Sequence, residues 1–419
     1  MATRDDTAVR AGPGSASAGW SGVAGGRWGR RLLWAVGCLS VAVVVGRAVH
    51  TAVTVHQLDL DVYLMGASHL FGGHLYTVQL PGSGLPFTYP PVAALAFVPL
   101  TVLGRTSAQV VWAVVSVVAL MGFIAVSLRA VRPGWPGSDV ARWSLVLSYP
   151  AMALDPVGLT FSFGQVNLVL ALLVLADLTG TWSIAGRTLP RGVLTGLAAA
   201  VKLTPAIFVP YLFLTRQVRA GVAALVTLVV AGLAMVVVVP SESWSFWTRY
   251  LFDAHRVGGV VFVSNQSLRS TLVRFTRDHA SEHLVVAVVA VVAVAGLAVA
   301  TWAARSSSPL LGVLVCAVTG LLVSPITWAH HLVWAVPVLL WLALAEDRPA
   351  GGRVWAAAGA AWLWWGAIWR VPHGSGRELH DSAAQLLLAD SYTLAMLLFV
   401  GGVALMLALR RRAGRSGSP

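Results

Sequence analysis

Apolar runs of about 20 residues, the length of a helix that crosses a bilayer, recur from Leu32 toward the C-terminus, for example at roughly 32–55 and 109–128. The chain as a whole is 57% hydrophobic and 11% charged, with a mean hydropathy of +0.78. A chain of this composition would not stay soluble in water. The sequence therefore predicts an all-α polytopic membrane protein.

The net charge of +13 comes from basic residues that collect in short clusters between the apolar runs. Such clusters mark the cytoplasmic ends of membrane spans, so the charge indicates topology and not nucleic-acid binding. We expect residues 1–31 to be a disordered cytoplasmic segment, 32–409 the transmembrane domain and 410–419 a basic cytoplasmic tail. The clusters contain Arg27, Arg30 and Arg31, then Arg216 and Arg219, and last Arg410, Arg411, Arg412 and Arg415.

This charge pattern predicts about 12 spans in the plasma (inner) membrane, with both termini in the cytoplasm. Three segments, at about 56–88, 241–282 and 371–389, then lie outside the cell. The middle segment interleaves aromatic residues with Arg249 and His255, which is typical of helices that lie in the membrane interface.

Shorter apolar pieces between about 143 and 214 are interrupted by Pro, Gly and polar residues. Interrupted helices are tolerated in a membrane where they line a cavity, so these pieces are expected to do so. The interruptions carry Asp155, Gln165, Asn167 and Lys202.

Two carboxylates, Asp59 and Asp61, follow the first span in a chain that has only 16 Asp and Glu residues. A carboxylate pair beside aromatic residues at a membrane surface favours a functional acid over a solvated one. The alternative for Asp59 is a helix N-cap or a surface acid. Both cysteines, Cys38 and Cys316, lie in apolar runs, so neither a disulfide framework nor a cysteine metal site is expected.

Five groups of residues carry a resemblance to a known family, and they occur in that family's order. They are Asp59-Leu-Asp-Val-Tyr63, Pro86-Phe-Thr-Tyr-Pro-Pro-Val-Ala-Ala-Leu95, Gly164-Gln-Val-Asn167, Val201-Lys-Leu-Thr-Pro205 with Asn265-Gln-Ser-Leu268, and Ser324-Pro-Ile-Thr-Trp-Ala-His-His331. With these stretches the chain resembles glycosyltransferase family 87, membrane enzymes of the GT-C fold that use polyprenyl-phosphate-mannose. It is similar to the actinobacterial α-1,2-mannosyltransferases of phosphatidylinositol mannoside and lipomannan synthesis.

The resemblance implies a GT-C fold with external interfacial helices and an inverting transfer of mannose to a glycolipid acceptor, without cofactor or metal. Such a transfer needs a base for the acceptor hydroxyl and positive charge or hydrogen bonds for the leaving phosphate. Asp59 matches the family's Asp-Leu-x-Val-Tyr and is implied to be the base, and His330 is the second catalytic candidate. The implied substrate-binding residues are Asp61, Tyr63, Tyr89, Gln165, Asn167, Lys202, Asn265, Gln266, Arg269 and His331.

Several of these residues have structural alternatives. Lys202 either meets the donor phosphate or extends its ammonium to the membrane surface. His330 and His331 either assist the phosphate or acceptor hydroxyl, with His330 as the acting member, or form a structural pair. Gln165 and Asn167 either bond sugar hydroxyls or satisfy the end of a broken helix.

Other functions share parts of this pattern. A lipid transporter or flippase would have spans and broken helices, but it would be expected to show duplicated halves, and the sequence has no repeat of fixed period. A membrane scaffold would need no group of polar residues at all. Among enzymes, the alternative is a GT-C transferase of another polyprenyl-phosphate sugar, such as arabinofuranose or glucose.

Overall fold

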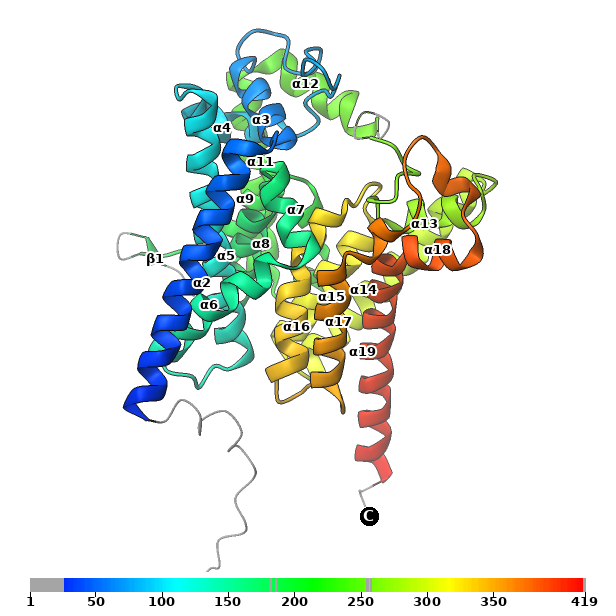
Figure 1. The fold of residues 1–419 in the computed structure, drawn as a ribbon. Helices are drawn as coiled ribbons and strands as arrows, with labels where there is room; N and C mark the ends of the chain where they lie inside the picture. The colour runs from blue at the N-terminus through cyan, green and yellow to red at the C-terminus, as the bar shows by residue number, and fades with distance from the viewer. Residues whose placement is uncertain (1–25, 181–182, 185–186, 254–255, 257, 417–419) are drawn as a thin grey trace, which may run out of the picture.

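The computed structural model describes residues 26–180, 183–184, 187–253, 256 and 258–416. These residues are helical with connecting loops, except for one antiparallel hairpin of strands β1 (Ser183–Ile184) and β2 (Arg187–Thr188). The lower end of the molecule in Figure 1 holds the start of the first described helix and the end of the last one. His255, expected in an interfacial segment, lies outside the described residues.

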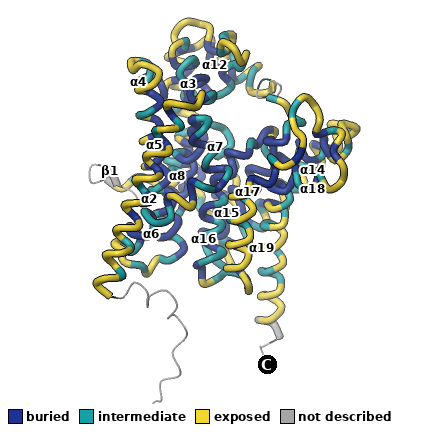
Figure 2. The backbone as a smooth tube through the Cα atoms, in the orientation of Figure 1, coloured by how far each residue is buried: buried dark blue, intermediate teal, exposed yellow. Residues whose placement is uncertain are grey.

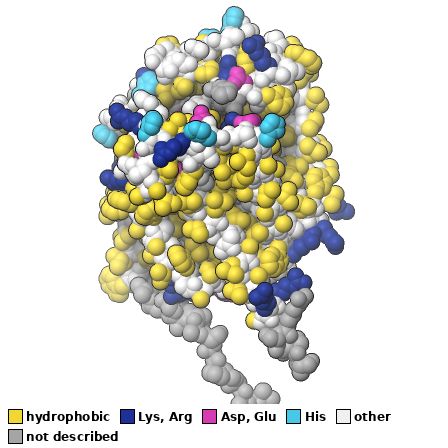
Figure 3. Space-filling model, turned by 90° about the vertical axis from the view of Figure 1, so that its right-hand side faces the viewer, with side chains coloured by type: hydrophobic (Ala, Val, Ile, Leu, Met, Phe, Trp, Pro, Cys, Tyr) yellow, Lys and Arg dark blue, Asp and Glu magenta, His cyan; other side chains and the backbone are white. Residues whose placement is uncertain are grey.

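Five of the described helices are long and apolar enough to cross a membrane. Their outer faces expose large apolar side chains: Val237 is 83% exposed, Val294 71% and Leu398 75%. Together such side chains form a broad hydrophobic belt (Figure 3), which is stable only against lipid. The prediction of a helical membrane protein is confirmed. The five helices are α2 (Arg27–Thr54), α5 (Arg105–Val131), α11 (Val218–Val238), α14 (Glu282–Ser306) and α19 (Ser391–Ser416).

Shorter helices fill the space between the long ones, and the tube in Figure 2 is most buried there. A helix of 11 residues rises only about 17 Å, so it ends inside the apolar layer, where its end groups need polar partners. These elements are α4 (Pro91–Thr101), α6 (Gly137–Met152), α7 (Asp155–Phe163), α8 (Asn167–Thr179), α9 (Val193–Val201), η1 (Thr204–Ile207), α10 (Phe208–Leu214), α15 (Pro309–Val323), η4 (Ala329–Trp334) and α16 (Ala335–Leu344). The helix α17 (Gly352–Trp365) is also short, but it is mostly exposed.

The helices α9 and α10 form a hairpin that enters and leaves at the same end of the molecule. Where α9 begins, Gly192 lies so close to Ala220 of α11 that a Cβ atom would not fit, and its φ of +102° suits glycine. Where α10 ends, the N–H of Gln217 donates to the Leu212 carbonyl at 2.8 Å, next to the start of α11. The two apolar pieces are therefore halves of one inserted hairpin, with Lys202 at its tip.

The base of this hairpin is fixed by a buried carboxylate, Asp177, in the last turns of α8. Asp177 accepts hydrogen bonds from the Gly192 and Thr195 N–H groups at 2.9 and 3.0 Å, and from the Thr195 hydroxyl at 2.6 Å. A carboxylate is favoured at a helix N-terminus, where backbone donors are unpaired. These hydrogen bonds fix the position of α9 along α8.

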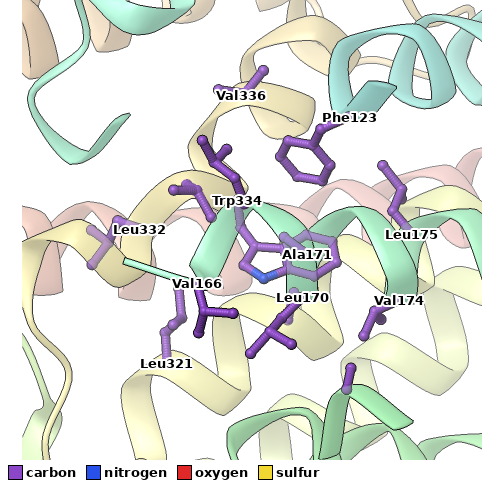
Figure 4. Close-up of a cluster of buried hydrophobic side chains, with 14 of the residues drawn as sticks. Phe123, Val166, Leu170, Ala171, Val174, Leu175, Leu321, Leu332, Trp334 and Val336 are labelled. Carbon is purple, nitrogen blue, oxygen red and sulfur yellow. The ribbon is translucent and has the colours of Figure 1, made fainter. Parts of the chain in front are cut away.

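Trp334 forms the centre of the core between these elements (Figure 4). Its indole lies 5.7 Å from the Phe123 ring of α5 and 5.9 Å from Phe208 at the start of α10. Leu170 of α8 and Leu321 of α15 surround the same side chain (Figure 4). Because Trp334 is the last residue of η4, this packing fixes the segment that carries the two histidines.

Helices that are not membrane spans cover the upper end in Figure 1. All but the short helix at residues 367–370 fall in the three segments that the sequence predicts to be external. These elements are α3 (Leu58–Ser68), α12 (Pro240–Thr248), η2 (Tyr250–Phe252), α13 (Leu268–Phe275), η5 (Ala367–Arg370), η6 (Arg377–His380) and α18 (Ala383–Ala389).

The start of α19 anchors this upper end through buried polar contacts. Asp390, just before α19, is fully buried and forms an ion pair with Arg274 of α13, which is buried as completely. Asp390 also accepts a hydrogen bond from the Thr271 hydroxyl at 2.5 Å. The Tyr392 hydroxyl donates to Asp155 of α7 at 3.0 Å. One helix end thus joins α13 to α7.

Replacing Arg274 with Gln should destabilise the protein by about 3–5 kcal/mol, because the Asp390 carboxylate would stay buried without its cation. Denaturant unfolding of the purified protein measures this loss. Arg269→Gln on the same helix is the matched control, since Arg269 and its partner Glu282 are 26% and 60% exposed. That variant should lose less than about 1 kcal/mol. Equal losses would mean that the Arg274 pair contributes no more than a surface pair.

Candidate functional site

The two aspartates that follow α2 lie on helix α3, and they have different partners. The buried Asp61 carboxylate accepts two hydrogen bonds from Arg105 of α5, at 3.0 Å from Nε and 2.6 Å from Nη2. The Nε2 atom of His56 lies 3.1 Å from the same carboxylate. Asp61 therefore joins α3 to the start of α5.

Asp59 faces the interior, where the Gln165 side chain and the Lys202 ammonium both act on its carboxylate. Burial raises the pKa of Asp59 from its usual 3.8 to about 6, and these two groups offset only part of that rise. Asp59 is still only half-buried by accessible surface. A carboxylate that is poorly solvated yet accessible is suited to accept a proton near neutral pH.

Two tyrosines and Gln165 form the wall beside Asp59. The Tyr63 hydroxyl donates to Gln165 Oε1 at 2.9 Å, and Gln165 Nε2 lies 3.4 Å from the Tyr89 hydroxyl. The rings of Tyr63 and Tyr89 are 5.0 Å apart. Gln165 is thereby oriented with its amide N–H groups toward Asp59 and Tyr89.

Lys202, at the tip of the α9–α10 hairpin, connects this wall to the histidines. Its Nζ atom donates to Asn167 Oδ1 at 3.0 Å and lies 3.0 Å from His331 Nε2. An ammonium has no lone pair, so His331 Nε2 is the acceptor and the proton of that neutral ring is on Nδ1. Lys202 Nζ also lies 5.3 Å from the centre of the Tyr89 ring.

Two side chains fix the peptide that joins the histidines. The His330 carbonyl accepts hydrogen bonds from Asn167 Nδ2 at 2.9 Å and from the Thr160 hydroxyl at 3.1 Å. The His330 ring is buried against Phe163 and His331, and within the described part of the chain neither ring nitrogen has a hydrogen-bond partner. A buried imidazole with two free nitrogens can still donate to or accept from a substrate.

A cavity of about 50 Å³ opens from Lys202, Asn167 and His331 toward the interior. Its other walls are mostly apolar and come from α8, η1, α10, α15 and η4. Ile207, Leu170 and Leu321 are typical of these walls. The Lys202 end of this cavity suits an anionic group, whereas a volume of about 50 Å³ admits only water-sized groups and no hydrocarbon tail.

Asn265 and Gln266 lie in a different environment, fully buried before α13. Asn265 Oδ1 accepts from the N–H groups of Thr327 and Ser267 at 3.0 and 3.2 Å. Gln266 Nε2 donates to the Val263 and Ala389 carbonyls, both at 2.7 Å. These bonds pair the segment with the strand-like stretch before His330, so the structure places both residues behind the histidines and not beside Asp59.

The predicted residues thus fall into two groups. Arg269 is bonded to Glu282 at 2.5 Å, and Asp61 to Arg105, at positions outside the Asp59 cluster. Among the described residues, no group of three or more His, Cys, Asp and Glu side chains is placed to hold a metal ion. The structure brings together Asp59, Tyr63, Tyr89, Gln165, Asn167, Lys202, His330 and His331.

Sequence reasoning missed Thr160 and Arg105. Arg105 offered a signal, because it is a lone arginine at the end of an apolar run whose other end carries Arg129 and Arg132. Such an arginine breaks the charge pattern and indicates an acidic partner. Thr160 offered none, since a threonine inside an apolar helix is common.

The model of glycosyltransferase family 87 matches residues 87–325, more than half of the chain. This chain belongs to glycosyltransferase family 87. The matched residues include Tyr89, Gln165, Asn167 and Lys202 of the cluster. The resemblance seen in the sequence is therefore confirmed.

Curated relatives match most of the chain. The polyprenol-phosphate-mannose-dependent alpha-(1-2)-phosphatidylinositol mannoside mannosyltransferase of Mycobacterium tuberculosis is 34% identical over 373 residues, covering 83% of this chain and 85% of that protein. The corresponding phosphatidylinositol pentamannoside mannosyltransferase of the same species is 35% identical over 368 residues, covering 83% and 81%. The phosphatidylinositol mannoside mannosyltransferase of Mycolicibacterium smegmatis is 34% identical over 369 residues, covering 80% of this chain and 81% of that protein. No solved structure gives a significant match.

Gly164 lets α3 approach the turn between α7 and α8, because a Cβ atom there would lie 2.7 Å from the Leu60 Cβ, next to Asp59. Gly164→Ala should lose about 1–2 kcal/mol through its φ of +67° and a further 1–3 kcal/mol through this contact. Chemical unfolding of the purified protein measures both. Gly73→Ala is the control, with a similar φ of +74° and nothing within 4 Å. A loss no larger than that of Gly73→Ala would show that α3 does not need this close approach.

Proposed function

We propose that the protein transfers mannose from polyprenyl-phosphate-mannose to a glycolipid of the phosphatidylinositol mannoside or lipomannan type, forming an α-1,2 linkage with inversion. The observation that carries this proposal is the juxtaposition of Asp59, an accessible carboxylate of raised pKa, with the Lys202 ammonium. The donor and the linkage come from the names of the mannosyltransferase relatives. One group can take a proton and the other can meet a phosphate, which are the two requirements of this reaction.

In the proposed reaction, the acceptor hydroxyl oxygen attacks C1 of mannose from the face opposite the phosphate. Its proton passes to the Asp59 carboxylate as the new C1–O bond forms. The bond between C1 and the phosphate oxygen breaks, and its electron pair leaves with the polyprenyl phosphate. Lys202 and the His330 ring supply a cation and a hydrogen-bond donor for the charge on that phosphate.

In this proposal, Tyr63, Tyr89, Gln165 and Asn167 orient the cluster and the sugar. His331 holds the Lys202 ammonium in place. We further propose the GT-C fold with about 12 membrane-inserted segments, of which α9 and α10 form the re-entrant hairpin. We place the protein in the plasma membrane with the cluster near the extracytoplasmic face, as the positive-inside rule requires for the arginine clusters at the lower end.

Replacing Asp59 with Asn should lower mannose transfer by a factor of about 10²–10⁴ without weakening donor binding, because proton acceptance is lost and so is a negative charge that opposes a phosphate on Lys202. The assay uses purified protein, radiolabelled polyprenyl-phosphate mannose and a panel of glycolipid acceptors. Wild-type kcat/KM should fall as the pH drops below about 6, where Asp59 of the free protein becomes protonated, and the residual kcat/KM of the variant should lack this fall.

Asp61→Asn is the matched control, because it is the same change two residues along the same helix. It should keep more transfer than Asp59→Asn, since its carboxylate bonds Arg105 instead of facing the cluster. The reverse order would assign the base to Asp61. Transfer of arabinofuranose or glucose in place of mannose would overturn the donor, and normal transfer by both variants would overturn the site.

Single cysteines at Ser68 and Thr248 should react with a membrane-impermeant maleimide on intact cells, and one at Ser306 should not. All three positions are exposed, the first two at the upper end and the third at the end of α14. The background carries Cys38→Ser, because Cys38 is exposed while Cys316 is buried. Labelling of Ser306→Cys alone would place the cluster near the cytoplasmic face and exclude an extracytoplasmic donor.

A further inference from the structure

The loop between α16 and α17, at the lower end of the molecule, forms a polar pocket that the proposed reaction does not use. Its volume is about 310 Å³, and Arg348 and Arg353 lie on its wall together with Glu346. Arg410 of α19 adds a third guanidinium, whose Nη2 donates to the Asp347 and Arg348 carbonyls at 3.0 and 3.2 Å. The pocket therefore lies at the start of α17, beside the end of α19, and is rich in positive charge.

The acids near this pocket are already engaged. Asp347 accepts hydrogen bonds from the Ser307 and Ser308 hydroxyls and from the Trp341 indole N–H, each at 2.8 Å. Glu346 forms an ion pair with Arg132 of α5 at 2.9 Å. Both carboxylates keep their negative charge, and Glu346 is 87% exposed on the pocket wall, but the four arginines Arg132, Arg348, Arg353 and Arg410 outnumber these two acids.

The arginines retain free donors. Arg348 uses Nη1 to bond the Ala345 carbonyl at 2.6 Å, which leaves most of its five N–H groups unused. Arg353 is exposed and has no side-chain partner among the residues that the structure describes. Guanidinium groups bind phosphate oxygens well, because two parallel N–H groups match two oxygens.

The surface next to the pocket is apolar. Val354 and Trp355, which follow Arg353 on α17, are 71% and 65% exposed, and Leu409, which precedes Arg410 on α19, is 55% exposed. Tryptophan is enriched at the level of lipid headgroups. Figure 3 shows arginines gathered at the lower edge of the hydrophobic belt. The pocket consequently lies where a bilayer changes from acyl chains to headgroups.

We propose that this pocket binds the phosphate headgroup of an anionic phospholipid, with the acyl chains lying along α17 and α19. Basic pockets between membrane helices bind such headgroups. Arginines that serve only to set topology need neither a concave site nor donors that point into it. The adjoining apolar side chains favour a lipid over a free anion. This site is independent of the proposed transfer reaction.

The test is native mass spectrometry of the purified protein titrated with phosphatidylglycerol in detergent micelles. Each lost arginine should weaken binding about fivefold, so Arg353→Gln should bind about fivefold more weakly and Arg348→Gln/Arg353→Gln roughly 25-fold more weakly. Phosphatidylcholine binding should not change. Arg219→Gln is the matched control, because Arg219 is an exposed arginine on α11 at the same end. It should stay within about twofold of the wild type.

Three outcomes would overturn the proposal. Equal weakening by Arg353→Gln and Arg219→Gln would mean that general surface charge attracts the lipid. Displacement of phosphatidylglycerol by inorganic phosphate at equal concentration would mean that the pocket takes a free anion. An unchanged affinity in Arg353→Gln would exclude the pocket, and this single exposed change keeps the test valid if the double variant does not fold.

Discussion

The ammonium of Lys202 is the group on which the arrangement of this protein depends. A charged amine held among apolar helices needs acceptors and negative charge, since an unpaired one is too costly to bury. Asn167, His331, the Tyr89 ring and Asp59 surround it, and they come from α8, η4, the loop before α4, and α3. These elements are brought together because each supplies one polar group to the same point.

This requirement explains why the central helices are short. A helix that crosses the membrane completely keeps its end groups in the headgroups, whereas α8 and α9 end inside and bring Asn167 and Lys202 to the interior. Hydrogen bonds join α8 and α9 at both ends. At one end Lys202 donates to Asn167, and at the other end Gly192 and Thr195 donate to Asp177. The position of Lys202 is therefore set by a contact at the far end of the same helix pair.

The sequence predicted the features that depend on composition and local order. Apolar length gave α2 and α5 nearly to their observed ends, and charge density singled out Asp59 and Lys202. Only the family motif separated Asp59 from Asp61, because the physical difference between them depends on Arg105, which is distant in sequence. The sequence could not show that Asn265 is bonded to backbone at a distance from Asp59, since a family motif marks scaffold and site residues alike. Three-dimensional partners decide these roles, and local patterns do not contain them.

Under the proposed function, the electrostatic interaction between Asp59 and Lys202 also couples donor binding to the base. The positive charge of Lys202 lowers the pKa of Asp59 in the empty protein, against the larger effect of burial. A donor phosphate on Lys202 would neutralise that charge, so the pKa of Asp59 would rise further above about 6. A more basic carboxylate takes the acceptor proton more readily. The carboxylate would thus be most reactive when the donor is in place, which favours transfer after both substrates have bound.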